Sequence, residues 1–376
     1  MSFLSLIKAE LKAILTNPVI VLTVIGGSIL YSFLYPQPYL NQLPRKQKVI
    51  LIDLDNTPLS RKLARMVSAT PQVDLVKTGF SIQEIEKAIQ KNEALGYLLI
   101  PKNFYKDIKR ELSPTLVYGG NASFFLVYGT IAEAIFEASQ KLDEQIKINQ
   151  KLYDTKTLSQ TTPSIKLNAK PVFNSTIGYI NYVIPAVFIL ILHQIMLIGA
   201  SIQGATQTEK GSGYWDRVGA FKLIVTRILV YLIVYLPISV YYMGFCFEHY
   251  SIPHLADMNI LIFFMFTFII SATSLGIFLG EIIPRRKLAT FFVLISSMPL
   301  VFTAGFVWPE HLITPWLHFL VQWVPVTPAI LSMIKLNQMG ADFMGIFDQW
   351  LQIFALGGFY LLLAFLIMRI KKNKSN

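Results

Sequence analysis

Two kinds of residue are scarce in this sequence: cysteine and charged side chains. Only one of its 376 residues is a cysteine, Cys246. A single thiol forms no internal disulfide and supplies no zinc or iron–sulfur site made of several cysteines. Charged residues are 15% of the chain and hydrophobic residues 53%, whereas soluble domains carry roughly 25% charged residues. With a mean hydropathy of +0.51, this composition argues against an ordinary cytosolic protein.

Long apolar runs are what the sequence has instead. A helix needs about 20 apolar residues to cross the hydrocarbon core of a bilayer. The first of the runs lacks a small-residue cleavage site, which favours a retained anchor over a signal peptide. We therefore predict a polytopic α-helical membrane protein with six transmembrane helices. The six runs are Pro18–Tyr35, Ile177–Ile202, Leu223–Phe247, Asn259–Ile283, Leu288–Val307 and Trp350–Met368.

The formal net charge is +11, and the basic residues next to these runs are unevenly distributed between the two sides of the predicted membrane. Cytoplasmic flanks of membrane proteins retain Lys and Arg. With the N-terminus inside, the two short external loops hold a single basic residue, Lys335, and the cytoplasmic flanks hold thirteen. This bias predicts that both termini are cytoplasmic, with a basic tail at residues 371–376. The thirteen are Lys8, Lys12, Lys210, Arg217, Lys222, Arg227, Arg285, Arg286, Lys287, Arg369, Lys371, Lys372 and Lys374.

Residues 1–17 have the pattern of an amphipathic helix. Such a helix suits the cytoplasmic membrane surface and would enter the first transmembrane helix, residues 18–35, at Pro18. The alternative is a simple extension of that span. The apolar residues that recur at helical spacing, with Lys8 and Lys12 between them, are Phe3, Leu4, Ile7, Leu11, Ile14 and Leu15.

Residues 36–176, between the first two spans, have a water-compatible composition. They hold 19 of the 33 basic residues and 13 of the 22 acidic ones, a net charge of +6 (19 minus 13). A segment of this length can bury a core of its own, and the predicted topology makes it extracytoplasmic. The charge of the whole chain is thus divided between membrane flanks and this segment. It gives no signal for nucleic-acid binding and fits contact with anionic lipid at the flanks.

Strand and helix patterns alternate within this segment. Thr57 before Pro58 is typical of a helix start, and Ser81 with Glu84 forms a capping box at the start of another helix. Further helices are predicted at about 103–111 and, as a long helix, at about 124–158. The alternation predicts an α/β domain that ends in a long helix. The predicted strands are Val49–Leu54, Val73–Lys77, Tyr97–Ile100 and Thr115–Gly119.

Asp53 and Asp55 follow the first strand in an Asp-x-Asp-x-Thr pattern. The pattern is similar to the first motif of haloacid-dehalogenase phosphatases, in which two such carboxylates act as nucleophile and acid/base. That chemistry also needs Mg²⁺ ligands from a later acidic pair, and the adjacent pair downstream, Asp143 and Glu144, lies in the predicted long helix. The favoured interpretation is that both side chains cap the strand-to-helix turn before Pro58.

Other polar residues lie in or near the predicted spans. His193 and Gln194 lie inside the second span, where polar groups are costly, and indicate either a helix–helix hydrogen bond or a substrate pathway. No stretch has the spacing of a Walker A phosphate loop. Four residues of one short loop lack regular metal-ligand spacing, which favours interfacial solvation over a metal site: Glu248, His249, His254 and Asp257.

Several short motifs occur in a fixed order at defined topological positions. They are Asp53–Asn56 (Asp-x-Asp-Asn), Leu98–Phe104 (ending in Ile-Pro-x-x-Phe), Glu209–Ser212 (Glu-x-Gly-Ser), Gly305–Pro309 (Gly-Phe-x-x-Pro), Pro315–Trp316 and Pro325–Thr327 (Pro-x-Thr). With one span, a large external domain and five further spans, the whole chain resembles the ABC-2 type permeases. These are the membrane subunits of ATP-binding-cassette exporters, and the resemblance is to the branch with a large periplasmic domain.

The resemblance implies a permease subunit of the bacterial inner membrane that forms the translocation pathway as a homo- or heterodimer. Residues 177–370 would be its five-helix transmembrane domain. ATP, Mg²⁺ and the ATPase site would belong to a separate ABC ATPase subunit, so this chain would have no catalytic, cofactor or metal residues of its own. A membrane-fusion adaptor and an outer-membrane channel are the further partners implied for the external domain.

The resemblance also implies where the ATPase docks. A cytoplasmic coupling loop at residues 203–222 would make the contact through Glu209, Lys210, Gly211, Ser212 and Arg217. The family often has a Leu-rich stretch ending in Pro after this element, whereas Tyr214–Val218 follows it in this chain. The coupling geometry is therefore less defined by the resemblance at that point.

Three prolines lie between the last two spans, at Pro309, Pro315 and Pro325. They interrupt any continuous helix, which predicts a re-entrant or interfacial segment. Two other functions remain open from the sequence. One is a non-transport membrane protein whose external domain binds a ligand or assists assembly, and the other is an ectoenzyme that uses Asp53 and Asp55.

Overall fold

The structure, a computed structural model, describes residues 1–40, 45–77, 85, 88, 93–110, 112–120, 125–153, 179–307 and 313–375. The chain forms two compact units, one from Met1–Leu40 with Pro171–Asn376 and the other from Asn41–Lys170. The predicted helix start at Ser81, the end of the predicted long helix beyond residue 153, and Pro309 lie outside the described residues.

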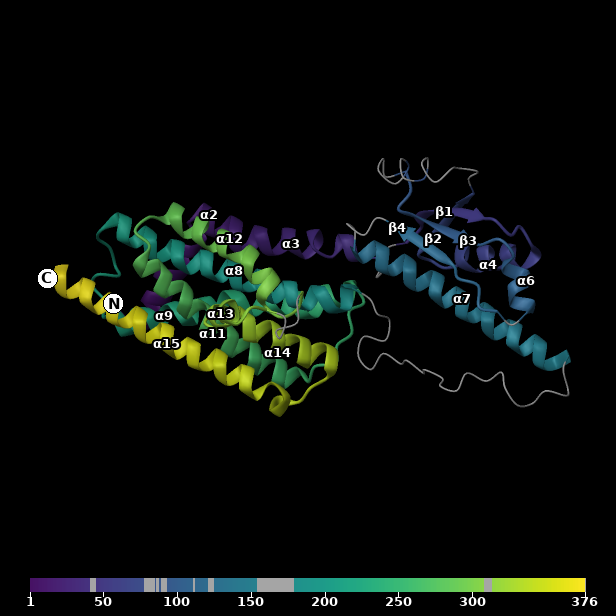
Figure 1. The fold of residues 1–376 in the computed structure, drawn as a ribbon. Helices are drawn as coiled ribbons and strands as arrows, with labels where there is room; N and C mark the ends of the chain where they lie inside the picture. The colour runs from purple at the N-terminus through teal and green to yellow at the C-terminus, as the bar shows by residue number, and fades with distance from the viewer. Residues whose placement is uncertain are drawn as a thin grey trace. The chain divides into compact units, whose positions relative to one another are not determined.

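A four-stranded sheet organises the unit Asn41–Lys170, with strand order β2-β1-β3-β4 (Figure 1). β1 pairs in parallel with β2 and β3, and β3 pairs antiparallel with β4. Each strand overlaps a predicted one, because the short runs of β-branched and aromatic residues are bounded by turn residues. The strands are β1 Gln47–Asp53, β2 Val73–Lys77, β3 Gly96–Ile100 and β4 Val117–Gly120.

The helices of this unit are α4 (Pro58–Ser68), α6 (Phe104–Lys109) and α7 (Phe125–Tyr153). They share a core with one face of the sheet, and alternate residues of β1 point to the other face, where Ile50 packs with Ile85. Such two-sided burial is typical of parallel strands. The first core includes Val49, Leu51, Leu63, Val67, Leu98, Phe104, Ile131, Ile135 and Leu142.

The start of α4 confirms the predicted cap. Thr57 Oγ1 accepts a hydrogen bond from Ser60 N at 3.3 Å, and Thr57 N donates to Ser60 Oγ at 3.0 Å. Pro58 occupies the first turn, where its missing N–H leaves no helical hydrogen bond unmade.

Among the described residues of the other unit, six helices are long and apolar enough to cross a membrane (Figure 1). Each overlaps one of the six predicted apolar runs, so six candidate spans are confirmed by length and composition. The six are Pro18–Tyr39, Tyr179–Lys210, Ala220–His249, Met258–Ile282, Arg286–Thr303 and Phe343–Asn373.

The first and third of these helices contain local irregularities. The first is made of α2 (Pro18–Val21), a π-helical stretch at Leu22–Gly27, α3 (Ser28–Leu34) and a 3-10 turn at Gln37–Tyr39. The third is made of α9 (Ala220–Val240), a π-helical stretch at Tyr241–Cys246 and α10 (Phe247–His249). The others are α8 (Tyr179–Lys210), α11 (Met258–Ile282), α12 (Arg286–Thr303) and α15 (Phe343–Ser375).

α8 is the central helix of this unit and packs against α11, α12 and α14. Its Gly204 lies against Gly280 of α11 so closely that a Cβ on Gly204 would be 3.0 Å from the Gly280 backbone. A Cβ on Gly276 would be 2.7 Å from the Cβ of Ala200. Small residues on both helices therefore let the two backbones approach, as in packed membrane helices.

The end of α8 corrects one predicted boundary. The loop predicted at residues 203–222 is helical up to Lys210, and α9 begins at Ala220, so the loop is confined to residues 211–219. The apolar run ends at Ile202, but the helix continues to Lys210 because Gln203, Gly204 and Gln207 are buried against neighbouring helices. It stops at Gly211, whose φ of +74° is a conformation that glycine adopts without a Cβ clash.

A broken helix pair precedes α15. α13 (Pro315–Val321) and α14 (Val326–Met339) are bent by 88° relative to each other, the geometry of a broken span or a re-entrant loop. Pro325 lies in the break, as the sequence predicts. Pro315 instead occupies the first turn of α13, where it starts a helix rather than interrupting one.

α1 (Phe3–Leu15) is a separate helix, because Thr16 and Asn17 divide it from α2. Phe3 and Leu4 of the predicted apolar stripe are exposed, and the placement of this helix at the membrane surface stays a prediction. Glu10 lies on the buried side of α1 because it pairs with Arg227 of α9. The buried residues of α1 are Leu6, Glu10 and Ile14.

Candidate functional site

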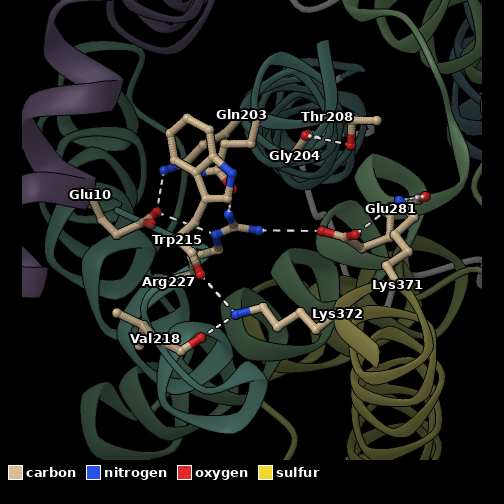
Figure 2. A network of polar contacts seen from close by, with 11 residues as sticks. Glu10, Gln203, Gly204, Thr208, Trp215, Val218, Arg227, Glu281, Lys371 and Lys372 are labelled. Atoms are coloured by element: carbon tan, nitrogen blue, oxygen red, sulfur yellow. Dashed lines mark hydrogen bonds and ion pairs between the residues drawn. The ribbon is translucent and has the colours of Figure 1, made fainter. Parts of the chain in front are cut away.

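The polar centre of the membrane unit is Arg227 of α9, which is 1% exposed. Its Nε lies 3.3 Å from Glu10 Oε2 of α1. Its Nη1 lies 3.7 Å from Glu281 Oε1 of α11 (Figure 2). One guanidinium group therefore joins three helices through two ion pairs.

Two glutamines of α8 complete the surroundings of Arg227. Gln203 Nε2 donates to Glu10 Oε2, and Arg227 Nη2 donates to Gln207 Oε1. Both glutamines are more than nine-tenths buried. They are four residues apart, so both lie on the side of α8 that faces the charges.

The C-terminal end of α15 adds two lysines. Lys371 Nζ lies 3.1 Å from Glu281 Oε2 and donates to the Glu281 backbone oxygen at 2.5 Å. Lys372 Nζ donates to the carbonyl oxygens of Trp215, at 2.8 Å, and Val218 in the 211–219 loop (Figure 2). The last helix is thereby connected both to α11 and to this loop.

The charges of this cluster balance. It contains two carboxylates and two cations, with two amides beside them. Burying an unpaired charge costs several kcal/mol, and pairing offsets much of that cost, so removing one partner destabilises more than the pair stabilises. We call the six residues the Arg227 network: Glu10, Gln203, Gln207, Arg227, Glu281 and Lys371.

The glycine contact between α8 and α11 places two members of the network. Gln203 directly precedes Gly204, and Glu281 directly follows Gly280. Because the two glycines meet backbone to backbone, the amide and the carboxylate are brought to the same level of the helix bundle. Small side chains at this crossing are therefore a condition for the network.

Glu209, a predicted coupling residue, lies in the last turn of α8 and contacts α12. Its Oε1 accepts a hydrogen bond from the backbone N of Arg286 at 2.9 Å, and its Oε2 lies 3.4 Å from Arg286 Nε. Arg286 is the first residue of α12. A carboxylate in this position satisfies a free N–H and interacts favourably with the helix dipole.

The other predicted coupling residues are exposed around the turn that follows α8. Lys210, Gly211 and Ser212 are consecutive, and Arg217 is exposed without an ion pair among the described residues. Asp216 Oδ2 accepts from Gly213 N at 2.9 Å and so closes the turn. The structure brings Glu209 to α12 but does not gather the five residues into one cluster.

Tyr214 links the 211–219 loop to the Arg227 network. Burial raises the pKa of its hydroxyl above the usual 10.0, and the nearby Glu10 carboxylate adds to that rise. The Arg227 cation acts in the opposite direction. The phenol of Tyr214 is therefore neutral at physiological pH beside the buried ion pairs.

His193 and Gln194 do not form the predicted helix–helix hydrogen bond in the described residues. The His193 ring is 1% exposed, its Nε2 has no hydrogen-bond partner, and it stacks on Phe268 of α11 with ring centroids 6.4 Å apart. Gln194 is half-buried on the same helix. The structure thus gives His193 an aromatic helix–helix contact.

Asp53 and Asp55 are engaged in the turn between β1 and α4, as the favoured interpretation predicts. Asp53 Oδ1 accepts from the backbone N of Asp55 at 3.1 Å and of Asn56 at 2.9 Å, and its Oδ2 accepts from Ser60 Oγ at 2.7 Å. Asp55 Oδ2 accepts from Thr57 Oγ1 at 2.6 Å and from Tyr105 N at 3.1 Å. Both carboxylates therefore stabilise local structure.

The short loop before α11 shows a similar local role for its acidic residue. Asp257 caps α11 by accepting from the backbone N of Asn259 at 2.9 Å and of Ile260 at 3.1 Å. Within the part of the chain that the structure describes, no three His, Cys, Asp or Glu side chains gather in a way that could hold a metal ion.

Sequence reasoning missed the partnership of Glu10, Arg227 and Glu281. The charge pattern predicts Arg227 only as a cytoplasmic flank residue, because its partner Glu10 is 217 residues away in the chain. One signal was present: Glu10 is the single acidic residue among the first 17 and sits between Lys8 and Lys12. An acid on the apolar side of an otherwise basic helix indicates a buried cationic partner.

The six candidate spans define a multi-pass helical membrane protein. A family profile described as "ABC-2 family transporter protein" matches residues 18–366, which is most of the chain. The chain therefore belongs to the ABC-2 transporter family, as the motifs predict, and has a permease role in membrane transport. The family implies an ABC ATPase as partner. No curated protein sequence gives a significant match to the chain.

Proposed function

We propose that this chain is the permease subunit of an ATP-driven exporter of the ABC-2 type. Two permease chains form the translocation pathway, and a separate ABC ATPase binds ATP and Mg²⁺ and supplies the energy. The observation that carries the proposal is the family match over residues 18–366. The substrate class is left open by the residues of the chain.

The proposed setting is the bacterial inner membrane with both termini in the cytoplasm. The thirteen basic residues on one side of the predicted topology, against Lys335 on the other, support this orientation. The unit Asn41–Lys170 is then an extracytoplasmic α/β domain, because it lies between the first two spans. In this setting it receives or passes on substrate, with a membrane-fusion adaptor and an outer-membrane channel as candidate partners.

The proposed coupling route starts at the end of α8 and the 211–219 loop. An ATPase that presses on this segment would move Glu209, which contacts the first residue of α12. It would also move the carbonyl oxygens that hold Lys372 of α15. The Arg227 network lies beside the loop and joins α1, α9 and α11. A local push would therefore reach several spans together.

Co-purification tests the proposed function. A tagged full-length chain is solubilised from native membranes, and the proteins that accompany it are identified and quantified. We expect an ATPase with a Walker A motif in fixed stoichiometry. If none accompanies the chain in any mild detergent, the exporter proposal is wrong and a non-transport membrane protein becomes the better account.

A further inference from the structure

A cleft of about 720 Å³ lies beside the Arg227 network in the membrane unit. Its walls come from the end of α1, from α2, from the last turns of α8, from the 211–219 loop and from the start of α12. The lining residues that matter for its chemistry are Val19, Ile20, Gln203, Lys210, Arg286 and Lys287.

The charged part of the lining is cationic. Lys210, Arg286 and Lys287 line the cleft, and no acidic residue is among the lining residues of this described region. Glu209 neutralises part of the charge of Arg286. Lys210 and Lys287 are exposed and have no ion pair among the described residues. Two ammonium groups are therefore free to bind an anion.

The cleft also contains buried polar atoms without partners. Three polar atoms of its lining residues are shielded from solvent and have no hydrogen-bond partner: Gln203 Oε1, Thr206 Oγ1 and Gln207 Nε2. Gln203 and Gln207 are 3% and 8% exposed, so leaving these polar atoms without a hydrogen bond is costly.

The rest of the lining is apolar and belongs to candidate spans. Val19 and Ile20 lie in the first span and Ile202 in the second. After Val19, the first span has exposed apolar side chains: Leu22 is 72% exposed and Ile25 is 44% exposed. The cleft thus has a cationic part, at Lys210 and Lys287, next to an apolar surface that can contact lipid acyl chains.

We propose that this cleft binds one anionic phospholipid, with its phosphate between Lys210 and Lys287 and an acyl chain along Val19, Leu22 and Ile25. Basic pockets between membrane helices at the headgroup level recognise such lipids. An acidic side chain of a partner protein would suit the cations, but it would not follow the apolar wall into the span. The proposal requires membrane insertion and does not depend on coupling to an ATPase.

Native mass spectrometry of the full-length chain tests the proposal. The detergent-solubilised protein is titrated with phosphatidylglycerol and, separately, with phosphatidylcholine of the same chain length. Near-surface lysines contribute about 1 kcal/mol each, so with two lysines we expect phosphatidylglycerol to be retained about thirtyfold more strongly. Equal retention of the two lipids would overturn the proposal. Adducts of the mass of free phosphate, without lipid, would also overturn it.

Matched charge variants locate the binding. The double variant Lys210→Gln/Lys287→Gln removes the two free cations of the cleft, and we expect it to lose the preference for phosphatidylglycerol. Lys8→Gln/Lys12→Gln removes the same charge from exposed positions of α1 outside the cleft and should keep the preference. If the two double variants behave alike, the lipid does not bind in this cleft.

Quenching of Trp215, which lines the cleft, reports whether the lipid lies in the cleft. The fluorescence difference between the wild type and Trp215→Phe in nanodiscs isolates this indole. We expect brominated phosphatidylglycerol to quench it more than brominated phosphatidylcholine does. No difference between the lipids, as when a second copy of the chain covers the cleft, would contradict the proposal.

Discussion

Arg227 joins α9 to three neighbouring helices. Its guanidinium group meets carboxylates from α1 and α11 and an amide from α8. In a buried setting, the cost of removing one partner of an ion pair comes mainly from the charge left behind. The network is therefore more sensitive to single substitutions than to replacement as a whole.

Arg227→Met tests this. The variant leaves Glu10 and Glu281 without their shared cation, and we expect a loss of about 3–5 kcal/mol in stability, as for other buried pairs. Thermal unfolding in detergent measures it as a lower Tm. Arg217→Met removes an exposed arginine that has no ion pair among the described residues and is the matched control. Equal Tm values for the two variants would show that the network does not stabilise the fold.

Glu209 is the predicted coupling residue for which the structure gives a contact. We expect Glu209→Ala to lower the ATP turnover that the permease stimulates, by about two- to fivefold, because a helix-terminal carboxylate contributes about 0.3–1 kcal/mol. Membrane insertion and expression should stay unchanged. Glu248→Ala, an exposed acid on the opposite side of the predicted topology, is the control and should leave turnover unchanged. Unaltered stimulation in Glu209→Ala would count against the coupling route.

At the scale of elements, the crossing of α8 and α11 sets the geometry of the network. A Cβ on Gly280 would lie 3.0 Å from the Ser201 carbonyl oxygen and 3.1 Å from the Ser201 Cα. Both are backbone atoms, so neither can move aside without shifting α8. The close approach is therefore a structural requirement at this position.

Gly280→Val should separate the two helices. Overpacking of this kind costs about 1–3 kcal/mol, and we expect a lower Tm and a smaller monodisperse fraction in size-exclusion chromatography. Gly358→Val is the matched control, because Gly358 also lies in a candidate span and a Cβ there meets nothing within 4 Å. If both variants behave like the wild type, the glycine contact is not needed.

Local signals explain which elements could be predicted from the sequence. The cap of α4 depends on Thr57, Pro58 and Ser60, which are neighbours in the chain, and the strand runs are equally local. Hydropathy predicts the end of the second span at Ile202, whereas α8 ends at Lys210, before the stop signal at Gly211. The burial of Glu10 depends on Arg227, a partner that no local pattern reveals.

For the whole molecule, charge and hydropathy predict the spans and the basic flanks, but they do not predict the contacts between helices. A formal charge of +11 on a chain with 53% hydrophobic residues resolves into basic flanks and a water-compatible segment, and six candidate spans follow from length and composition. The networks between spans could not be predicted, because the pairing of helices depends on side chains far apart in the chain.

We propose that a separate ATPase docks on the segment around Glu209–Arg217. Photo-crosslinking in living cells tests this docking, with a photoreactive amino acid placed at Ser212 in the 211–219 loop. A second variant carries it at Ser251, an exposed residue on the opposite side of the predicted topology. We predict that Ser212 captures an ATPase subunit and that Ser251 does not. Capture of no ATPase at Ser212, or capture at Ser251 instead, would contradict the account.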